Sequence, residues 1–210
     1  MSQTTPTRNA AATRNRFLQA AFIEFYTNSF QGGSINHIVE QAGATKGALF
    51  HHFDGKQQLG YAVVDEIIGP LLLQRWLSPL PNTDDPIKAI VTAFRKYVRT
   101  DIESGHFVNG CPLNNLAQEM SPLDQGFHQR IDALYVSWRA GVAEALTRGV
   151  AAGTVRPNVQ PKKVAALIVA SQMGIWGTGK SSQDPAQMRS AAEALCTYLQ
   201  SLHINSKSPN

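Results

Sequence analysis

The sequence predicts an all-α protein with a small helix-turn-helix head followed by a larger helical body. Apolar residues recur at helical spacing along most of its 210 residues. Residues 34–53 divide into two short amphipathic stretches around a central Ala-Gly-Ala, and Asp85-Pro86 and Asp184-Pro185 each have the cap and the first-turn proline of a helix start. We therefore expect a head at residues 1–56 and a body at residues 57–210, linked by a fourth helix that starts at about residue 56.

The first helix is expected from about Ala10 to Tyr26. Its inward side carries apolar residues at helical spacing: Leu18, Ala21, Phe22 and Phe25. Three arginines lie near its start, namely Arg8, Arg14 and Arg16. Each arginine is interpreted either as a contact to a nucleic-acid phosphate or as part of a solvated face.

The second helix and the turn after it have clear local signals. Ser34 is placed to cap this helix, because its hydroxyl would accept a hydrogen bond from a free backbone N–H. The inner face then follows the spacing i, i+3, i+4, i+7 with Ile35, Ile38, Val39 and Ala42. Gly43 tolerates the positive φ that a tight turn between helices requires, and Thr45 is placed to cap the third helix.

The third helix has one apolar side and one slim polar side. Leu49 and Phe53 lie one turn apart and anchor it to the core. The other residues face outward: Lys46, Gly47, Ala48, His51 and His52. A helix whose first turn is small, polar and cationic fits the major groove of DNA, which is about 12 Å wide. The alternative interpretation is a helical hairpin packed inside an all-α protein.

At these residues the sequence resembles the TetR family of one-component transcriptional regulators. The matching residues are Ala20–Tyr26, Ser34, Ile38, Ala42-Gly43, Thr45-Lys46-Gly47, Leu49-Phe50, His52-Phe53, Lys56 and Leu59. The resemblance implies a three-helix DNA-binding head, a ligand-binding body, and a homodimer that reads a palindromic double-stranded DNA operator. Where the family usually has Tyr, this chain has Phe50, so a hydroxyl that commonly reaches a phosphate is missing.

The candidate DNA-binding residues follow from this interpretation. Lys46 and His51 are expected near bases. Ser34, Thr45, His52 and Lys56 would position phosphates, and Gly47 and Phe50 complete the surface. Because Phe50 lacks the hydroxyl, His52 and Lys56 would carry more of the contact with the DNA backbone.

The body is expected to consist of long helices. Asp54-Gly55-Lys56-Gln57 has the D-x-x-Q spacing of a capping box at the start of the fourth helix, and Gly69-Pro70 should kink or end that helix. Residues 77–86 carry three prolines and are interpreted as a connection between the domains. Further helices are expected at residues 86–104, 111–120, 123–152 and 161–176, and from residue 185 onward.

The last two expected helices have a common role. The helix that starts at Pro161 is apolar nearly all round, so it has to be covered on all sides. Two such C-terminal helices from each of two chains would form a four-helix dimer interface.

One segment of the body, Asn109–Ser121, reads NGCPLNNLAQEMS. It resembles a Gly-Cys-Leu…Asn-Leu…Glu-Met motif found in a subset of the family, with Pro112 after the cysteine. Cys111 would lie at a helix N-terminus, where the helix dipole favours the thiolate. Two interpretations stay open: a thiol sensor of electrophiles or oxidants whose modification releases the operator, and an inert cysteine that lines a ligand cavity.

A small-molecule effector is expected to bind between the body helices, among aromatic and aliphatic groups with a few polar ones. The candidate residues are Phe94, Phe107, Cys111, Asn115, Tyr135, Trp138, Gln172 and Trp176. Each of them, taken alone, also fits a place in the packed core.

Other functional classes find little support in the sequence. The histidines lack partners at i,i+4, so we expect neither a metal nor a cofactor. A hydrolase built on Cys111 and His106 would need an oxyanion-hole motif and an orienting acid, which the sequence does not offer, so we expect no enzyme. The alternatives to a repressor are an activator, or a helical small-molecule-binding protein without specific DNA binding.

Composition agrees with a DNA-binding protein without proving one. The formal net charge of +4 is mildly basic, and 43% hydrophobic residues suffice for a sizeable core. There is neither a run of about 18 apolar residues nor the apolar core of a signal peptide. The sequence therefore predicts a cytoplasmic protein without a membrane partner.

Overall fold

The computed structural model describes residues 6–204 and the side chains from residue 10 onward. The side chain of Arg8 therefore lies outside the described residues. The chain forms two compact units: unit 1 comprises the residues up to Pro70 together with Asn115–Ile131, and unit 2 comprises Leu71–Asn114 together with the residues from Asp132 onward. The described part is helical apart from turns and an isolated bridge between Val155 and His203. This confirms the all-α prediction.

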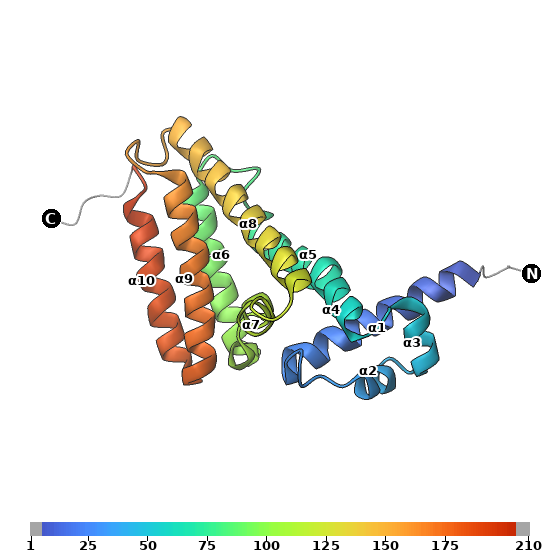
Figure 1. The fold of residues 1–210 in the computed structure, drawn as a ribbon. Coiled ribbons are helices and arrows are strands. Elements are labelled where there is room, and N and C mark those ends of the chain that lie inside the picture. Colours follow the sequence, from blue (N-terminus) through green and yellow to red (C-terminus); the bar gives the residue numbers. More distant parts are fainter. Residues whose placement is uncertain (1–5, 205–210) are drawn as a thin grey trace, which may run out of the picture. The chain divides into compact units, whose positions relative to one another are not determined.

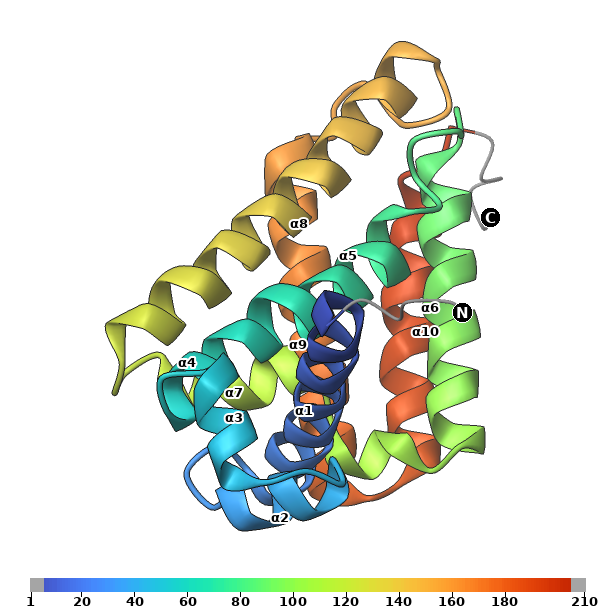
Figure 2. The same cartoon turned by 90° about the vertical axis from the view of Figure 1, so that its right-hand side faces the viewer.

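Unit 1 begins with the expected three-helix head. Helix α1 spans Pro6–Asn28, α2 spans Ile35–Gln41 and α3 spans Lys46–His52, and α2 and α3 lie beside α1 (Figure 2). The first helix is longer than the expected Ala10–Tyr26. It ends where Ser29 adopts a positive φ of 65°, a conformation that cannot continue an α-helix.

Aromatic rings fill the core of unit 1. The ring of Phe30 lies 5.0 Å from that of Phe25 and 4.7 Å from that of Phe127, measured between centroids. Gly60 permits this packing, because a Cβ there would lie 2.5 Å from the Phe30 ring and 2.7 Å from that of Phe127. Phe127 belongs to helix α8, Gln125–Ala151, so a segment distant in sequence completes the core of the head.

The helical path continues through the expected break at Gly69-Pro70. Helix α4, Lys56–Val63, passes into a π-helical turn, η1, at Val64–Ile68, and then into α5, Gly69–Leu77. The Gly69 N–H donates to the Val64 carbonyl, five residues back. The wider turn accommodates the missing amide of Pro70 without ending the helix.

The expected helix caps are confirmed at three positions and corrected at two. The side chains of Thr45, Asp85 and Asp184 each accept a backbone N–H at the start of α3, α6 and α10. Ser34 is the N-cap of α2, but its hydroxyl caps none of the described N–H groups. The expected capping box at Asp54 is wrong, because Gly55, with a φ of 99°, occupies the N-cap position of α4.

Unit 2 is built around long helices. Helices α6 (Pro86–Glu103), α9 (Pro161–Ser182) and α10 (Pro185–Ser201) lie side by side (Figure 1). The 3₁₀ turn η2 (His106–Asn109) leads into α7 (Pro112–Met120). Helix α9 is longer than predicted and ends at Gln183, which has a φ of 51°. None of the described helices is long and apolar enough to cross a membrane.

The proline-rich stretch at residues 77–86 does not connect the two units. It joins α5 to α6, and Leu71–Asn114 belongs entirely to unit 2. The expectation of an interdomain connection at this point is therefore wrong. The chain instead passes between the units within helices: after Pro70 in α5, after Asn114 in α7 and after Ile131 in α8.

Candidate nucleic-acid interface and effector site

The helix-turn-helix has the geometry that its sequence suggested. Gly43 adopts a φ of 58° in the turn, and the Ala44 N–H donates to the Val39 carbonyl at 3.1 Å. The hydroxyl of Thr45 accepts a hydrogen bond from the Ala48 N–H at 3.2 Å. Leu49 is fully buried and holds α3 against the core. The third helix is therefore firmly positioned by its inner face and its cap.

The outer face of α3 is accessible. Most of the predicted DNA-binding residues are exposed: Thr45, Lys46, Gly47, Phe50 and His51. Ser34, His52 and Lys56 are half-buried. The Phe50 ring is 51% exposed, which is unusual for a large apolar side chain and leaves it free to meet another molecule.

Two of the predicted phosphate-binding residues are partly engaged within unit 1. The Lys56 Nζ donates to the Gln31 carbonyl at 3.0 Å and lies over the Phe30 ring. Burial, together with the nearby His51 and Arg14, lowers the pKa of His52. A neutral His52 still offers one N–H to a phosphate, but it adds no positive charge.

The arginines of α1 have different environments. Arg14 donates to both carboxylate oxygens of Glu66, at 2.5 and 2.6 Å, and its guanidinium lies over the Phe53 ring. Arg16 is exposed, and its guanidinium donates to the Thr13 hydroxyl at 3.3 Å. Of these two residues, Arg16 is the better placed for a phosphate.

Two carboxylates that the sequence reasoning missed position the helix-turn-helix. The carboxylate of the buried Glu24 accepts a hydrogen bond from the Ser34 N–H at 2.8 Å. The carboxylate of Glu119 accepts from the N–H groups of Phe30 and Gln31, at 2.9 and 2.7 Å. Carboxylates of α1 and α7 thus fix the turn between α1 and α2 by hydrogen bonds. Only the Glu-Met motif could have drawn attention to Glu119 from sequence.

Unit 2 contains a polar group inside an aromatic core. The Asp101 carboxylate accepts from the Arg75 guanidinium at 2.6 Å and from the Trp176 Nε1–H at 2.7 Å. The Trp76 ring packs against Phe94, Trp138 and Trp176, with centroids 4.9, 5.7 and 5.6 Å away. We call Trp76, Phe94, Trp138 and Trp176 the tryptophan cluster. Sequence reasoning missed Arg75, Trp76 and Asp101, because their pairing spans distant helices.

The predicted pocket residues are mostly buried. Phe94, Phe107, Cys111, Trp138, Gln172 and Trp176 are each at most 7% exposed. The Tyr135 hydroxyl lies 3.2 Å from the Met173 sulfur. Asn115 belongs to unit 1, whereas the other seven residues belong to unit 2.

Two opposing effects act on the pKa of Cys111. The sulfur does accept from the N–H groups of Leu113 and Asn114 at the start of α7, which favours the thiolate. Burial is the larger effect, however, and it raises the pKa of Cys111 above its ordinary value. A protonated, buried thiol fits the inert interpretation and not that of a reactive sensor.

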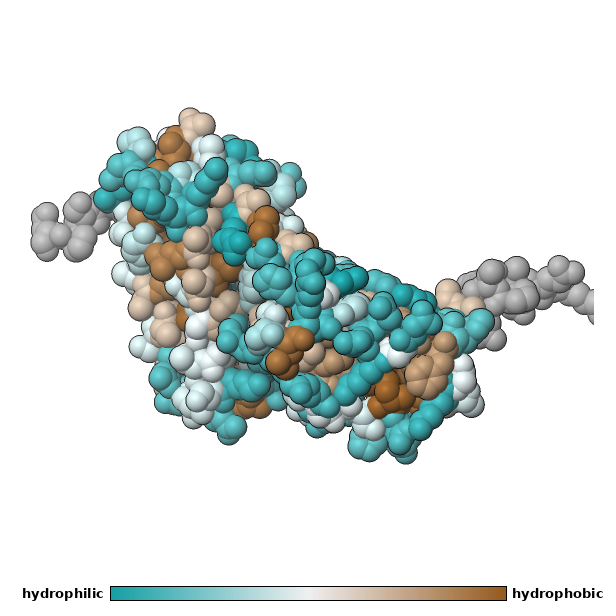
Figure 3. Space-filling model, viewed as in Figure 1, coloured by the Kyte–Doolittle hydropathy of each residue, from teal (hydrophilic) through white to brown (hydrophobic). Residues whose placement is uncertain are grey.

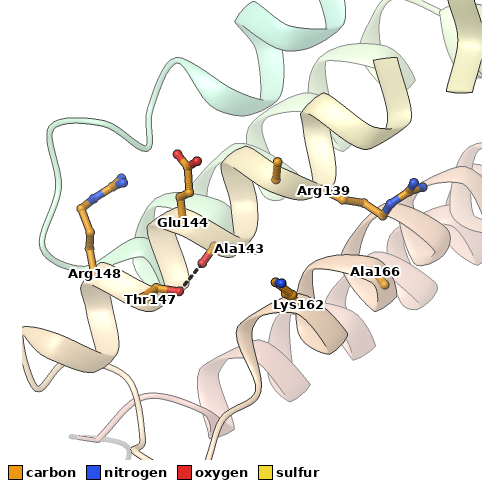
Figure 4. A pocket seen from close by; sticks show the side chains of 8 residues that line it. Arg139, Ala143, Glu144, Thr147, Arg148, Lys162 and Ala166 are labelled. Carbon is orange, nitrogen blue, oxygen red and sulfur yellow. Dashed lines mark hydrogen bonds between the residues drawn. The ribbon is translucent and has the colours of Figure 1, made fainter. Parts of the chain in front are cut away.

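An open cavity of about 730 Å³ lies between α8 and α9. Figure 4 shows side chains that line it, of which Arg139, Glu144, Arg148 and Lys162 are charged and Ala143 and Ala166 are small. The Thr147 hydroxyl donates to the Ala143 carbonyl at 2.9 Å and is therefore used within its own helix. This cavity includes none of the eight predicted pocket residues.

Family models of known proteins match both the head and the body of the chain. Residues 17–63 match the model for bacterial regulatory proteins of the tetR family, and residues 85–195, more than half of the chain, match the tetracyclin repressor-like C-terminal domain. The regulator LmrA of Bacillus subtilis is 28% identical over 135 residues, which span 64% of this chain and 71% of LmrA. The repressor DhaR of Mycobacterium sp. strain GP1 is 25% identical over 150 residues, which span 71% of this chain and 73% of DhaR.

A solved structure shows the same fold. A TetR transcriptional regulator from Chloroflexus aurantiacus superposes with a TM-score of 0.80 at 24% identity, covering 93% of this chain and 98% of that one. Family members are DNA-binding transcriptional regulators that typically respond to ligands. The chain belongs to the TetR family of helix-turn-helix transcriptional regulators.

Proposed function

We propose that this protein is a cytoplasmic, homodimeric repressor that leaves a palindromic operator when a small-molecule effector binds unit 2. The observation that carries the proposal is the exposed outer face of α3, which presents Lys46, Phe50 and His51 on a helix anchored by Leu49. Two such helices would enter successive major grooves, about one helical turn apart.

The candidate contacts divide into two kinds. Lys46 and His51 lie near base edges, while Ser34, Thr45, His52 and Lys56 position phosphates. Gly47 keeps the first turn slim, so the helix approaches the groove floor closely. The Ser34 hydroxyl supports this assignment, because it caps none of the described N–H groups of α2 and is left for a phosphate.

The dimer interface would be formed by the outer faces of α9 and α10. Leu167 is 44% exposed and Tyr198 is 40% exposed, and a Cβ added at Gly174 would meet nothing within 4 Å. Figure 3 shows apolar surface over α9. Exposed apolar and small residues on two neighbouring long helices are typical of a surface that buries itself against a second copy.

The effector site would lie among the buried candidates of unit 2: Phe94, Phe107, Cys111, Tyr135, Trp138, Gln172 and Trp176. Coupling to the head would use α5 and α7, because the chain passes from one unit to the other within both helices. We further propose that Gly110–Met120 places the chain in the subset with the Gly-Cys…Asn-Leu…Glu-Met motif. An effector would then favour a separation of the two α3 helices that no longer fits the operator.

A gel shift with the DNA upstream of the protein's own gene tests this function. We expect a specific complex that Lys46→Ala weakens by about tenfold or more at equal salt, since a cationic contact in the groove is lost. Lys88→Ala, an exposed lysine on α6, is the matched control for charge. Equal binding by Lys46→Ala and wild type would show that α3 is not the recognition helix. A promoter-reporter assay then distinguishes repression from activation.

A further inference from the structure

We propose that the effector is a neutral, planar ring compound with one hydrogen-bond acceptor and one donor, bound at the tryptophan cluster by Arg75, Trp76 and Gln172. Arg75 Nε–H and Trp76 Nε1–H would donate to its acceptor, and Gln172 Oε1 would accept from its donor. This inference rests on the proposed function, because it specifies the ligand to which unit 2 responds.

Three unpartnered polar atoms carry the inference. Within the described part of the chain, Arg75 Nε, Trp76 Nε1 and Gln172 Oε1 are buried without a hydrogen-bond partner. Trp76 is 5% exposed and Gln172 is 2% exposed. Buried polar groups in folded proteins are almost always hydrogen-bonded, so each such group needs an explanation. Together they provide two donors and one acceptor for another molecule.

The three residues are linked through Trp176. Arg75 and Trp76 are consecutive in α5, and the Trp76 and Trp176 rings are 5.6 Å apart. The Arg75 guanidinium also lies 5.5 Å from the centre of the Trp176 ring. Gln172 precedes Trp176 by four residues in α9, which places both on the same helix face one turn apart. A single small molecule is therefore the simplest common partner.

Charge around the cluster favours a neutral ligand. The Asp101 carboxylate already balances the Arg75 guanidinium at 2.6 Å. A ligand carboxylate would place a second negative charge beside Asp101 in a buried site, where an unpaired charge is costly. Cys111 and Tyr135 cannot supply a compensating positive charge, because a thiol and a phenol are neutral when protonated and negative when ionised.

The apolar walls favour a planar ring. The Trp76 and Trp138 rings lie at 20° to each other and the Trp76 and Trp176 rings at 88°, so the cluster combines stacked and edge-to-face ring contacts. Aromatic ligands form both kinds of contact. An acyclic aliphatic compound would lack such ring contacts.

A matched set of probes tests the inference on the full-length protein. The probes are para-hydroxyacetophenone, para-ethylphenol without the carbonyl acceptor, para-methylacetophenone without the hydroxyl donor, and para-hydroxybenzoate with a negative charge. Calorimetry and thermal unfolding measure binding. We expect para-hydroxyacetophenone to bind about tenfold or more tightly than each of the others, and to raise the melting temperature most.

Three variants locate the site. Gln172→Leu removes a polar atom at similar size, and Trp76→Phe removes the indole N–H together with part of the ring. Each should weaken binding of para-hydroxyacetophenone by about tenfold. Ala143→Leu, in the cavity between α8 and α9, should leave its affinity unchanged. Gln172→Leu should also unfold at the same temperature as wild type or higher without a probe, which shows that the fold is intact.

Several outcomes would overturn the inference. The first is that Gln172→Leu binds para-hydroxyacetophenone as tightly as wild type does. The second is that para-hydroxybenzoate binds most tightly of the four probes. The third is that Ala143→Leu is the only variant that loses binding. Failure of all four probes, combined with destabilisation by Gln172→Leu, would show that the polar atoms bind ordered water only. The gel shift without any probe separates these failures from a failure of the proposed function, since operator binding would then persist.

Discussion

The carboxylate of Glu119 accepts hydrogen bonds from the backbone N–H groups of Phe30 and Gln31, 89 and 88 residues earlier in the chain. Both N–H groups lie in the turn that precedes α2. Glu119 itself lies in α7, which begins in unit 2 and ends in unit 1. A displacement of α7 would therefore act directly on the turn that orients the helix-turn-helix.

Removal of this carboxylate should weaken operator binding. Glu119→Ala leaves two backbone N–H groups without their acceptor, and we expect a loss of about 1–3 kcal/mol in unfolding free energy. Operator affinity should fall by about tenfold, because α2 and α3 lose a constraint on their orientation. Urea unfolding and gel shifts measure the two effects. The exposed neighbour Gln118→Ala is the control, and equal behaviour of the two variants would contradict the role of Glu119.

Asp124 should make stability depend on pH in the acid range. The Tyr61 hydroxyl, 2.7 Å from its carboxylate, is the main reason that the pKa of Asp124 is lowered, and the Phe127 N–H adds to the effect. A lowered pKa in the folded state means stabilisation that is complete above the unfolded pKa, about 3.9, and is lost as pH falls through the folded value.

Asp124→Asn removes this contribution, so its deficit relative to wild type should be largest near pH 7 and shrink below about pH 4. Urea unfolding at several pH values measures it, with the exposed Asp132→Asn as control. A deficit that stays constant down to pH 2 would mean that Asp124 does not act through its charge.

Phe50 offers a gain-of-affinity test. Phe50→Tyr restores the hydroxyl that related proteins commonly use on a phosphate, and one such hydrogen bond is worth about 0.5–1.5 kcal/mol, or roughly two- to tenfold in affinity. The gain should be similar on the operator and on unrelated DNA, and the salt dependence should not steepen, because no cation is added. Gel shifts across salt concentrations provide the measurement. A gain confined to the operator would instead indicate that residue 50 reads a base.

The dimer interface can be tested at Leu167. Leu167→Glu places a charge on the outer face of α9 and should convert the dimer into a monomer at micromolar concentration, because a buried unpaired charge costs several kcal/mol. Light scattering after size exclusion measures the mass. Ile23→Glu is the matched control, since Ile23 is 62% exposed on α1. A Leu167→Glu protein that remains dimeric would place the interface elsewhere.

Cys111 should resist alkylation in the folded protein. Burial raises its pKa, and burial also raises the pKa of Cys196 to about 11, so neither thiol offers appreciable thiolate at pH 7. Mass spectrometry after iodoacetamide should find both unmodified until urea unfolds the chain. Ser78→Cys, at an exposed position after α5, provides a reactive control. Rapid modification of Cys111 in the native protein would restore the sensor interpretation.

The sequence by itself determined the local features of this protein. Helix periodicity, the glycine at position 43, and the caps at Thr45, Asp85 and Asp184 depend on neighbours within a few residues, so they were predictable. The same local rule failed at Asp54, where Gly55 takes the cap position with a backbone conformation open to glycine.

Only the tertiary structure decided which distant groups meet. Hydrogen bonds join Glu119 to Phe30, Arg75 to Asp101 and Trp176 to Asp101, which are far apart in sequence. The periodicity of a helix does not specify the helix against which it packs. Burial likewise set the direction of the Cys111 pKa, because desolvation outweighed the helix N-terminus on which the sequence argument relied. Long-range packing therefore determined the polar chemistry of the body, whereas the pattern of residues 34–53 was sufficient to predict the helix-turn-helix.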